Sequence, residues 1–128
     1  MMSQRMVLDA IEIARAADLY LISVGEMKET SVLRQQQIIT ADEMRSLREH
    51  GVVCDTLGAF FDAEGRIVNH PLGDLSLSVG VDTLRGRNVV LLAAGLEKTE
   101  AICALLRSGL VRRLIIDGDT AAQLVSLL

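Results

Sequence analysis

Residues 88–98 read Asn-Val-Val-Leu-Leu-Ala-Ala-Gly-Leu-Glu-Lys, and this stretch decides the fold. Its first half is a short continuous apolar run, which is typical of a buried strand in a parallel sheet. The run ends at Gly95, after which Ile102 and Leu105 stand at helical spacing. A short apolar run at residues 114–116 and a last helix follow. Strand, helix, strand and helix in this order predict parallel strands that are joined by right-handed crossovers.

The first half of the chain adds a helix, a strand and a second helix. Apolar residues recur at helical spacing over residues 4–17, and residues 19–24 form an apolar run that predicts another buried strand. The polar stretch 26–37 has no clear pattern and fits a surface loop. Thr-Ala-Asp-Glu at residues 40–43 is a capping box, which predicts a helix that begins there and ends at Gly51.

The middle of the chain has the signals of a hairpin. Residues 52–61 are rich enough in β-branched and aromatic residues to predict one strand, and residues 62–65 supply a turn that leads to residues 66–68. Asp82 is predicted to cap a short helical turn. Together these elements predict an α/β fold of Rossmann-like layers, with a mostly parallel sheet and one β-hairpin.

Composition excludes several classes of function. The 128 residues are enough for one domain, half of them are apolar, and only Tyr20, Phe60 and Phe61 are aromatic. The net charge of −4 provides no general attraction to nucleic acid. No apolar run reaches the roughly 18 residues of a membrane span, and no signal peptide is recognisable, so we expect no membrane partner and a cytoplasmic location. Cys54 and Cys103 lack metal-site spacing and are interpreted as small buried hydrophobes.

The junction Gly95-Leu96-Glu97-Lys98 is the first candidate site. A helix that begins here presents free backbone amides and the positive end of its dipole, Gly95 allows close approach of a ligand, and Lys98 adds a compact positive charge. These features could hold a phosphate. The alternative is an ordinary strand-to-helix turn, because many such turns contain a glycine and bind nothing. The stretch matches neither nucleotide-binding glycine motif, so no cofactor is predicted, and no metal site either.

Three motifs in order resemble the effector-binding domain of SorC-type bacterial transcription regulators. They are the first strand ending at Gly25, the segment Gly-Val-Val-Cys-Asp-Thr-Leu-Gly-Ala-Phe-Phe-Asp-Ala-Glu-Gly at residues 51–65 followed by His-Pro-Leu at 70–72, and Gly-Leu-Glu-Lys at 95–98. The resemblance implies a fold related to ribose-5-phosphate isomerase and glucosamine-6-phosphate deaminase. It also implies a phosphorylated sugar or a similar metabolite as effector, with ligand-binding residues Gly25, Asp55, Gly95, Leu96, Glu97 and Lys98.

The sequence departs from the family pattern near this expected site. Ala94 and Ser23 stand where the family usually has glycine, so each adds a side chain beside the ligand surface. Asp55 is placed near the sugar only by the resemblance, and capping of the turn at Thr56 or pairing with an arginine explains it equally well. For Asp117, which follows the last strand, two roles are open. It fits a ligand-binding crevice at the carboxyl ends of the strands, and it equally fits the N-cap of the last helix.

Three functions remain open at this stage. The first is a sensor whose ligand shifts subunit association, with DNA bound only through a segment that is not present here. The second is a sugar-phosphate isomerase or deaminase, which we disfavour because no acid pairs with Asp55, His50 and His70 look structural, and no catalytic residue is predicted. The third is a remnant of such a domain that serves only in oligomerisation and binds no ligand. We expect residues 1–128 to form a single, partial sugar-binding domain that lacks the helix-turn-helix segment and associates as a homo-oligomer, most simply a dimer.

Overall fold

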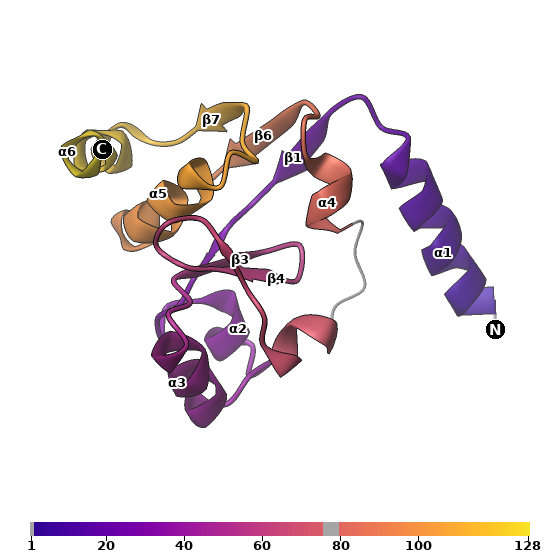
Figure 1. Ribbon diagram of the computed structural model, residues 1–128, viewed down its shortest axis with the longest axis horizontal. Coiled ribbons are helices and arrows are strands. Elements are labelled where there is room, and N and C mark those ends of the chain that lie inside the picture. The colour runs from indigo at the N-terminus through magenta and orange to yellow at the C-terminus, as the bar shows by residue number, and fades with distance from the viewer. Residues whose placement is uncertain (1, 76–79) are drawn as a thin grey trace.

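Three parallel strands form the first sheet of the computed structural model, which describes residues 2–75 and 80–128. The strands are β1 (Tyr20–Ile22), β6 (Val89–Leu92) and β7 (Arg113–Ile115), and β6 lies in the middle (Figure 1). Tyr20 pairs with Val89, and Leu91 pairs with Leu114. The strands and the parallel pairing predicted from the apolar runs are therefore confirmed, but the sheet is buried on one face only, since Leu21 and Ile115 are more than half exposed.

The second sheet is antiparallel and has four strands in chain order, β2 (Gly25–Glu26), β3 (Cys54–Thr56), β4 (Ala59–Phe61) and β5 (Ile67–Val68). The α/β class is confirmed, but the antiparallel part is larger than the one hairpin that the sequence predicted. The prediction of a single strand over 52–61 is wrong, because the chain turns back at Leu57 and Gly58. Their φ angles of 53° and 77° are those of a two-residue hairpin turn.

Six α-helices are described, with a 3₁₀ turn at Pro71–Leu75 and another at Leu96–Lys98. The helices are α1 (Met2–Arg15), α2 (Val32–Gln35), α3 (Ala41–Glu49), α4 (Val81–Leu84), α5 (Thr99–Arg107) and α6 (Gly118–Leu127). The Thr40 capping box is confirmed: the Glu43 amide donates to Thr40 Oγ1 at 3.0 Å, and the Thr40 amide donates to Glu43 Oε1 at 2.8 Å. Asp82 was predicted as a cap and is not one, because Gly80 is the N-cap and Asp82 lies inside the first turn, where it pairs with Arg85.

The main core lies between one face of the parallel sheet, α5 and the second sheet. Its fully buried members include Val89, Leu91, Ile102 and Phe61. Cys54 and Cys103 are free and buried, which confirms their interpretation as small hydrophobes. A smaller cluster packs α3 against the antiparallel sheet. It contains Met27, Ile39, Met44, Leu47, Val52 and Phe60.

The turn between β4 and β5 approaches the end of α5 closely. Gly65 takes a φ of 80°, as the sequence predicted for this turn. A Cβ at Gly65 would lie 2.7 Å from the carbonyl oxygen of Ala104 and would also collide with the amide of Ser108. Glycine is therefore required here both for its backbone conformation and for the close packing of the hairpin on the helix.

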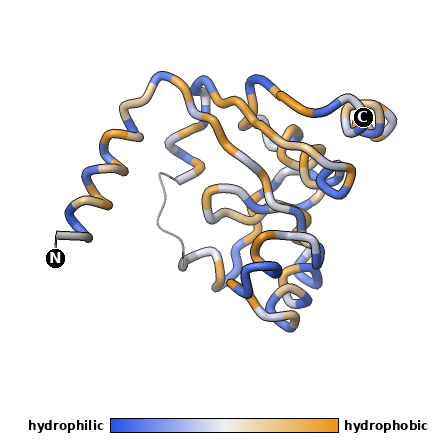
Figure 2. The backbone as a smooth tube through the Cα atoms, turned by 180° about the vertical axis from the view of Figure 1, so that it is seen from behind, coloured by the Kyte–Doolittle hydropathy of each residue, from blue (hydrophilic) through white to orange (hydrophobic). Residues whose placement is uncertain are grey.

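Two apolar surfaces of the chain are uncovered. On the outer face of the parallel sheet, Leu19, Leu21, Leu92 and Ile115 are each about half exposed or more. Helix α1 stands apart from the other elements (Figure 1), and apolar residues recur along it (Figure 2); the side chains of Met6, Leu8 and Ile13 are exposed. Two hydrogen bonds hold its end: Tyr20 Oη donates to Ala14 O at 2.6 Å, and Arg87 Nη1 donates to Arg15 O at 2.7 Å. Among the described residues, no helix has the length and apolar character of a membrane span.

Candidate functional site

A cavity of about 550 Å³ opens at the carboxyl end of β1, where the chain leaves the parallel sheet and enters the antiparallel one. Residues 21–25, 31–33, 55–57 and Lys98 line it. Three of the residues predicted to bind ligand, Gly25, Asp55 and Lys98, therefore meet in one place although they are far apart in the sequence. The carboxyl ends of parallel strands are the usual place for ligand sites in α/β proteins.

Gly25 and Asp55 face each other across the β2–β3 pair. A Cβ at Gly25 would collide with the Asp55 carboxylate, and even its carboxyl carbon lies within 3.3 Å of that position. The glycine thus leaves the space that the carboxylate occupies. Any larger residue at position 25 would have to displace the Asp55 side chain.

Asp55 Oδ1 is buried and has no hydrogen-bond partner in the part of the chain that the structure describes. Burial raises the pKa of Asp55 from 3.8 to about 6, with Lys98 opposing this rise and Glu26 adding to it. The described contacts include neither a cap at Thr56 nor a pair with an arginine; the Thr56 hydroxyl donates instead to Ser23 O at 2.6 Å. A buried acceptor without a donor is costly, and it makes Asp55 a candidate for contact with a ligand.

Lys98 connects this cavity to a buried glutamate. Its Nζ donates to the carbonyl oxygen of Val24 at 2.8 Å and lies 3.6 Å from Glu26 Oε2. The Glu26 side chain is only 4% exposed, whereas that of Lys98 is 23% exposed. No pattern in the sequence indicates that Glu26 is buried. Only the register of the two-residue strand β2 shows that this glutamate points inward.

The loop Gly95–Glu97 lies beside the cavity and does not line it. Gly95 has a φ of 111°, and its amide donates to Asp117 Oδ1 at 3.1 Å. The amide of Lys98 donates to Gly95 O at 3.0 Å, and the side chain of Glu97 folds back to Gly95. Leu96 and Glu97 are exposed and line other cavities. The expectation of free backbone amides at this helix start is therefore wrong for Lys98, because a 3₁₀ turn precedes α5 and uses the Lys98 amide.

The two departures from the family pattern differ in their position. Ser23 lines the cavity, whereas Ala94 is exposed and lies outside it. Asp117 caps α6, since its Oδ2 accepts from the Thr120 amide at 3.1 Å. Hydrogen bonds from the Thr120 side chain and the Gly95 amide hold its pKa down at about 2. Capping is thus the role that the structure assigns to Asp117.

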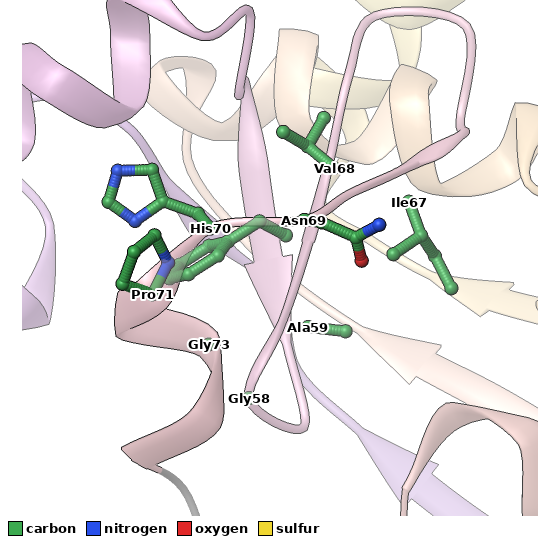
Figure 3. A pocket seen from close by; sticks show the side chains of 9 residues that line it. Gly58, Ala59, Ile67, Val68, Asn69, His70, Pro71 and Gly73 are labelled. Atoms are coloured by element: carbon green, nitrogen blue, oxygen red, sulfur yellow. The ribbon is translucent and has the colours of Figure 1, made fainter.

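A second cavity of about 540 Å³ lies over β4 and β5 (Figure 3). His70 and Pro71 are at one side of it, and Asn69 and Ile67 are at the other. Both ring nitrogens of His70 are engaged, Nε2 with Ser46 Oγ at 3.1 Å and Nδ1 with the Leu72 amide at 3.2 Å. Among the described residues that line this cavity there is no carboxylate, lysine or arginine, so the Asp55 cavity is the better candidate. No cluster of metal-ligand side chains occurs among the described residues.

Known proteins match nearly the whole chain. A family model described as "Putative sugar-binding domain" matches residues 1–126. The erythritol catabolism regulatory protein EryD of Brucella abortus is 30% identical over 125 residues, which are 98% of this chain and 40% of that protein. The deoxyribonucleoside regulator of Bacillus subtilis is 30% identical over 117 residues, or 91% of this chain and 37% of that protein. The chain thus spans about two fifths of these relatives.

Solved structures agree with the fold. A DeoR family transcriptional regulator from Listeria monocytogenes superimposes with a TM-score of 0.85 at 25% identity, and the match covers 94% of this chain and 49% of that one. The full-length sorbitol operon regulator SorC from Klebsiella pneumoniae gives a TM-score of 0.80 at 20% identity, covering 93% of this chain and 39% of that one. At that identity the second match is evidence for the fold alone.

Proposed function

Since the chain belongs to the family of sugar-binding domains carried by SorC-type transcription regulators, we propose that it binds a phosphorylated sugar or a related metabolite in the Asp55 cavity. Binding would make it the effector-sensing part of a regulator that acts in the cytoplasm and contacts DNA through a different segment. The effector must bind two states of the regulator with different affinity, because only that difference shifts their populations.

The unpartnered oxygen of Asp55 is the observation that carries this proposal. An ionised carboxylate only accepts hydrogen bonds, and the hydroxyl groups of a sugar are donors of suitable size and number. Asp55 lines the cavity, and the missing side chain at Gly25 provides the space that its carboxylate occupies. The names of two relatives, a regulator of erythritol catabolism and a deoxyribonucleoside regulator, point to the same class of hydroxyl-bearing compounds.

Lys98 would receive the anionic end of a phosphorylated ligand. It is the only cationic side chain among the described residues that line the cavity. The loop Gly95–Glu97 lies directly before it in the chain and could add backbone donors from Leu96 and Glu97. In this orientation the sugar hydroxyls contact Asp55, and the phosphate lies toward the start of α5.

We also propose self-association through the outer face of the parallel sheet. The chain has a solvent-accessible surface of 7984 Å², whereas a compact monomer of the same mass would have about 6,700 Å². The excess of about 1,300 Å² is that of the whole chain, including the detached helix α1, and it is larger than the roughly 800 Å² that each partner buries in a standard interface. Parallel sheets are normally covered on both faces, and a second copy that packs on Leu21, Leu92 and Ile115 would cover this one.

Binding without turnover is the expected outcome for this cavity. A raised pKa like that of Asp55 also occurs in catalytic carboxylates. However, the only other ionisable side chain among the described lining residues is Lys98, and Glu26 and Val24 already hold it. An isomerase or deaminase needs an acid and a base that can both reach the substrate.

Calorimetry with ribose 5-phosphate, glucosamine 6-phosphate and ribose tests the proposal. Asp55→Asn should weaken binding about tenfold or more, because the ligand loses its charged acceptor. Asp9→Asn removes an exposed carboxylate on α1 and should leave binding unchanged. Equal affinities for wild type and Asp55→Asn would contradict the site. Turnover of either sugar phosphate that disappears in Asp55→Asn would favour the enzyme.

A further inference from the structure

Glu26 lies next to Lys98 but outside the Asp55 cavity. It lines a neighbouring cavity of about 180 Å³, together with Arg48 and Glu100. Its side chain is almost fully buried, and Lys98 is its only ion-pair partner among the described residues. A buried carboxylate without a counter-charge is strongly destabilising, so the charge of Lys98 is needed by the protein itself.

The pairing of Lys98 with Glu26 therefore limits how strongly the ligand cavity attracts an anion. Lys98 has three N–H donors, one of which binds Val24 O while the ammonium also pairs with Glu26. Two carboxylates, Glu26 and Asp55, surround this single ammonium. A phosphate that reaches Lys98 must compete with Glu26, whereas a neutral polyol needs only the free acceptor of Asp55.

We propose that Glu26 sets the charge of the ligand that the cavity accepts. By pairing with Lys98 it lowers the affinity that a ligand phosphate adds to the affinity provided by the sugar hydroxyl groups. Glu26 acts through Lys98 without touching the ligand, so it is a positioning residue. The inference rests on the proposed site in the Asp55 cavity, and it deepens that proposal by naming the residue that governs ligand charge.

The test compares Glu26→Gln with Glu100→Gln. Glutamine keeps the size and polarity of Glu26 and frees Lys98, which is partly exposed and can be solvated. Glu100 is exposed and lines the same neighbouring cavity, so its substitution removes the same charge without an ion pair to Lys98. The probes are inorganic phosphate, ribose and ribose 5-phosphate, measured by calorimetry and by ligand-induced thermal stabilisation.

Glu26→Gln should bind inorganic phosphate and ribose 5-phosphate about tenfold more tightly than wild type, while its affinity for ribose stays the same. Adding Lys98→Met to Glu26→Gln should abolish the gain, because the freed ammonium is its source. Glu26→Asp shortens the side chain but keeps its charge, and it should give a smaller gain of the same sign. This variant decides the question if Glu26→Gln does not fold.

Equal phosphate affinity in wild type and the Glu26 variants would overturn the inference. The same gain in Glu100→Gln, or a gain that survives Lys98→Met, would do so too, because either result would show a general effect of charge. These outcomes are separate from the proposed function. If no form of the protein binds ribose or ribose 5-phosphate but Glu26→Gln gains affinity for inorganic phosphate, the proposed function fails and the role of Glu26 stands.

Discussion

Asp55→Asn should stabilise the folded chain at neutral pH while it removes the ligand contact. The pKa of Asp55 is about 6 in the folded protein, against 3.8 for an unperturbed aspartate, and burial is the main cause. The folded state therefore binds the proton more tightly than the unfolded state does. The stability that protonated Asp55 contributes is fully present below about pH 4 and is lost as the pH rises through about 6.

The magnitude follows from the difference between the two pKa values. Each pKa unit corresponds to about 1.36 kcal/mol, so ionised Asp55 costs the folded state on the order of 3 kcal/mol at pH 7 and above. Asparagine does not ionise and avoids this cost. The free energy of unfolding of Asp55→Asn, relative to wild type, should therefore rise by up to about 3 kcal/mol between pH 4 and pH 7.5.

Urea unfolding followed by circular dichroism at several pH values between 4 and 7.5 measures this difference. Protein concentration must be held constant, because self-association would add to the apparent stability. Asp9→Asn serves as the control, since its exposed carboxylate should change stability little at any pH. A stability difference between Asp55→Asn and wild type that does not change with pH would refute the reasoning, whatever its sign. The expected result is a more stable protein that no longer binds, as is common when a binding site keeps an unfavourable charge.

Three further predictions follow from the packing and from the ion pair. Lys98→Ala should destabilise the chain by about 3 kcal/mol in urea unfolding, because it leaves Glu26 buried and unpaired; a loss that persists when Glu26→Gln is added would contradict this. Gly65→Ala should lower stability by at least about 2 kcal/mol, and clearly more than Gly51→Ala, because both glycines have φ near 80° but only Gly65 is crowded by α5. Sedimentation should show a dimer that Ile115→Glu dissociates, and a clean monomer from micromolar to near-millimolar concentration would rule out the interface.

Much of the fold could be predicted from local signals. The apolar runs at 19–24 and 88–93 gave the parallel strands, and the Thr40 capping box gave the start of α3. The turn at Leu57 was not predicted, because leucine rarely takes a positive φ and Gly58 alone is a weak signal for the reversal. Its conformation is imposed by the pairing of β3 with β4, which is a tertiary effect.

The candidate site was predicted in part, and the reasons differ from residue to residue. Gly25, Asp55 and Lys98 were identified from motifs, and the structure brings them to one cavity. Glu26 was missed because its burial depends on the register of a two-residue strand that has no periodicity to detect. The number of free backbone amides after Gly95 was overestimated, because a 3₁₀ turn and an ordinary helix start have the same sequence pattern.

Asp117 links two segments that otherwise have separate roles. One of its carboxylate oxygens holds the amide of Gly95, and the other caps α6 at Thr120. A ligand that shifts the Gly95 loop would therefore loosen the first turn of α6, and a partner that clamps α6 would restrain the loop. Because α6 ends in the exposed side chains of Val125 and Leu127, a shift of the Gly95 loop would reach the protein surface through this one carboxylate.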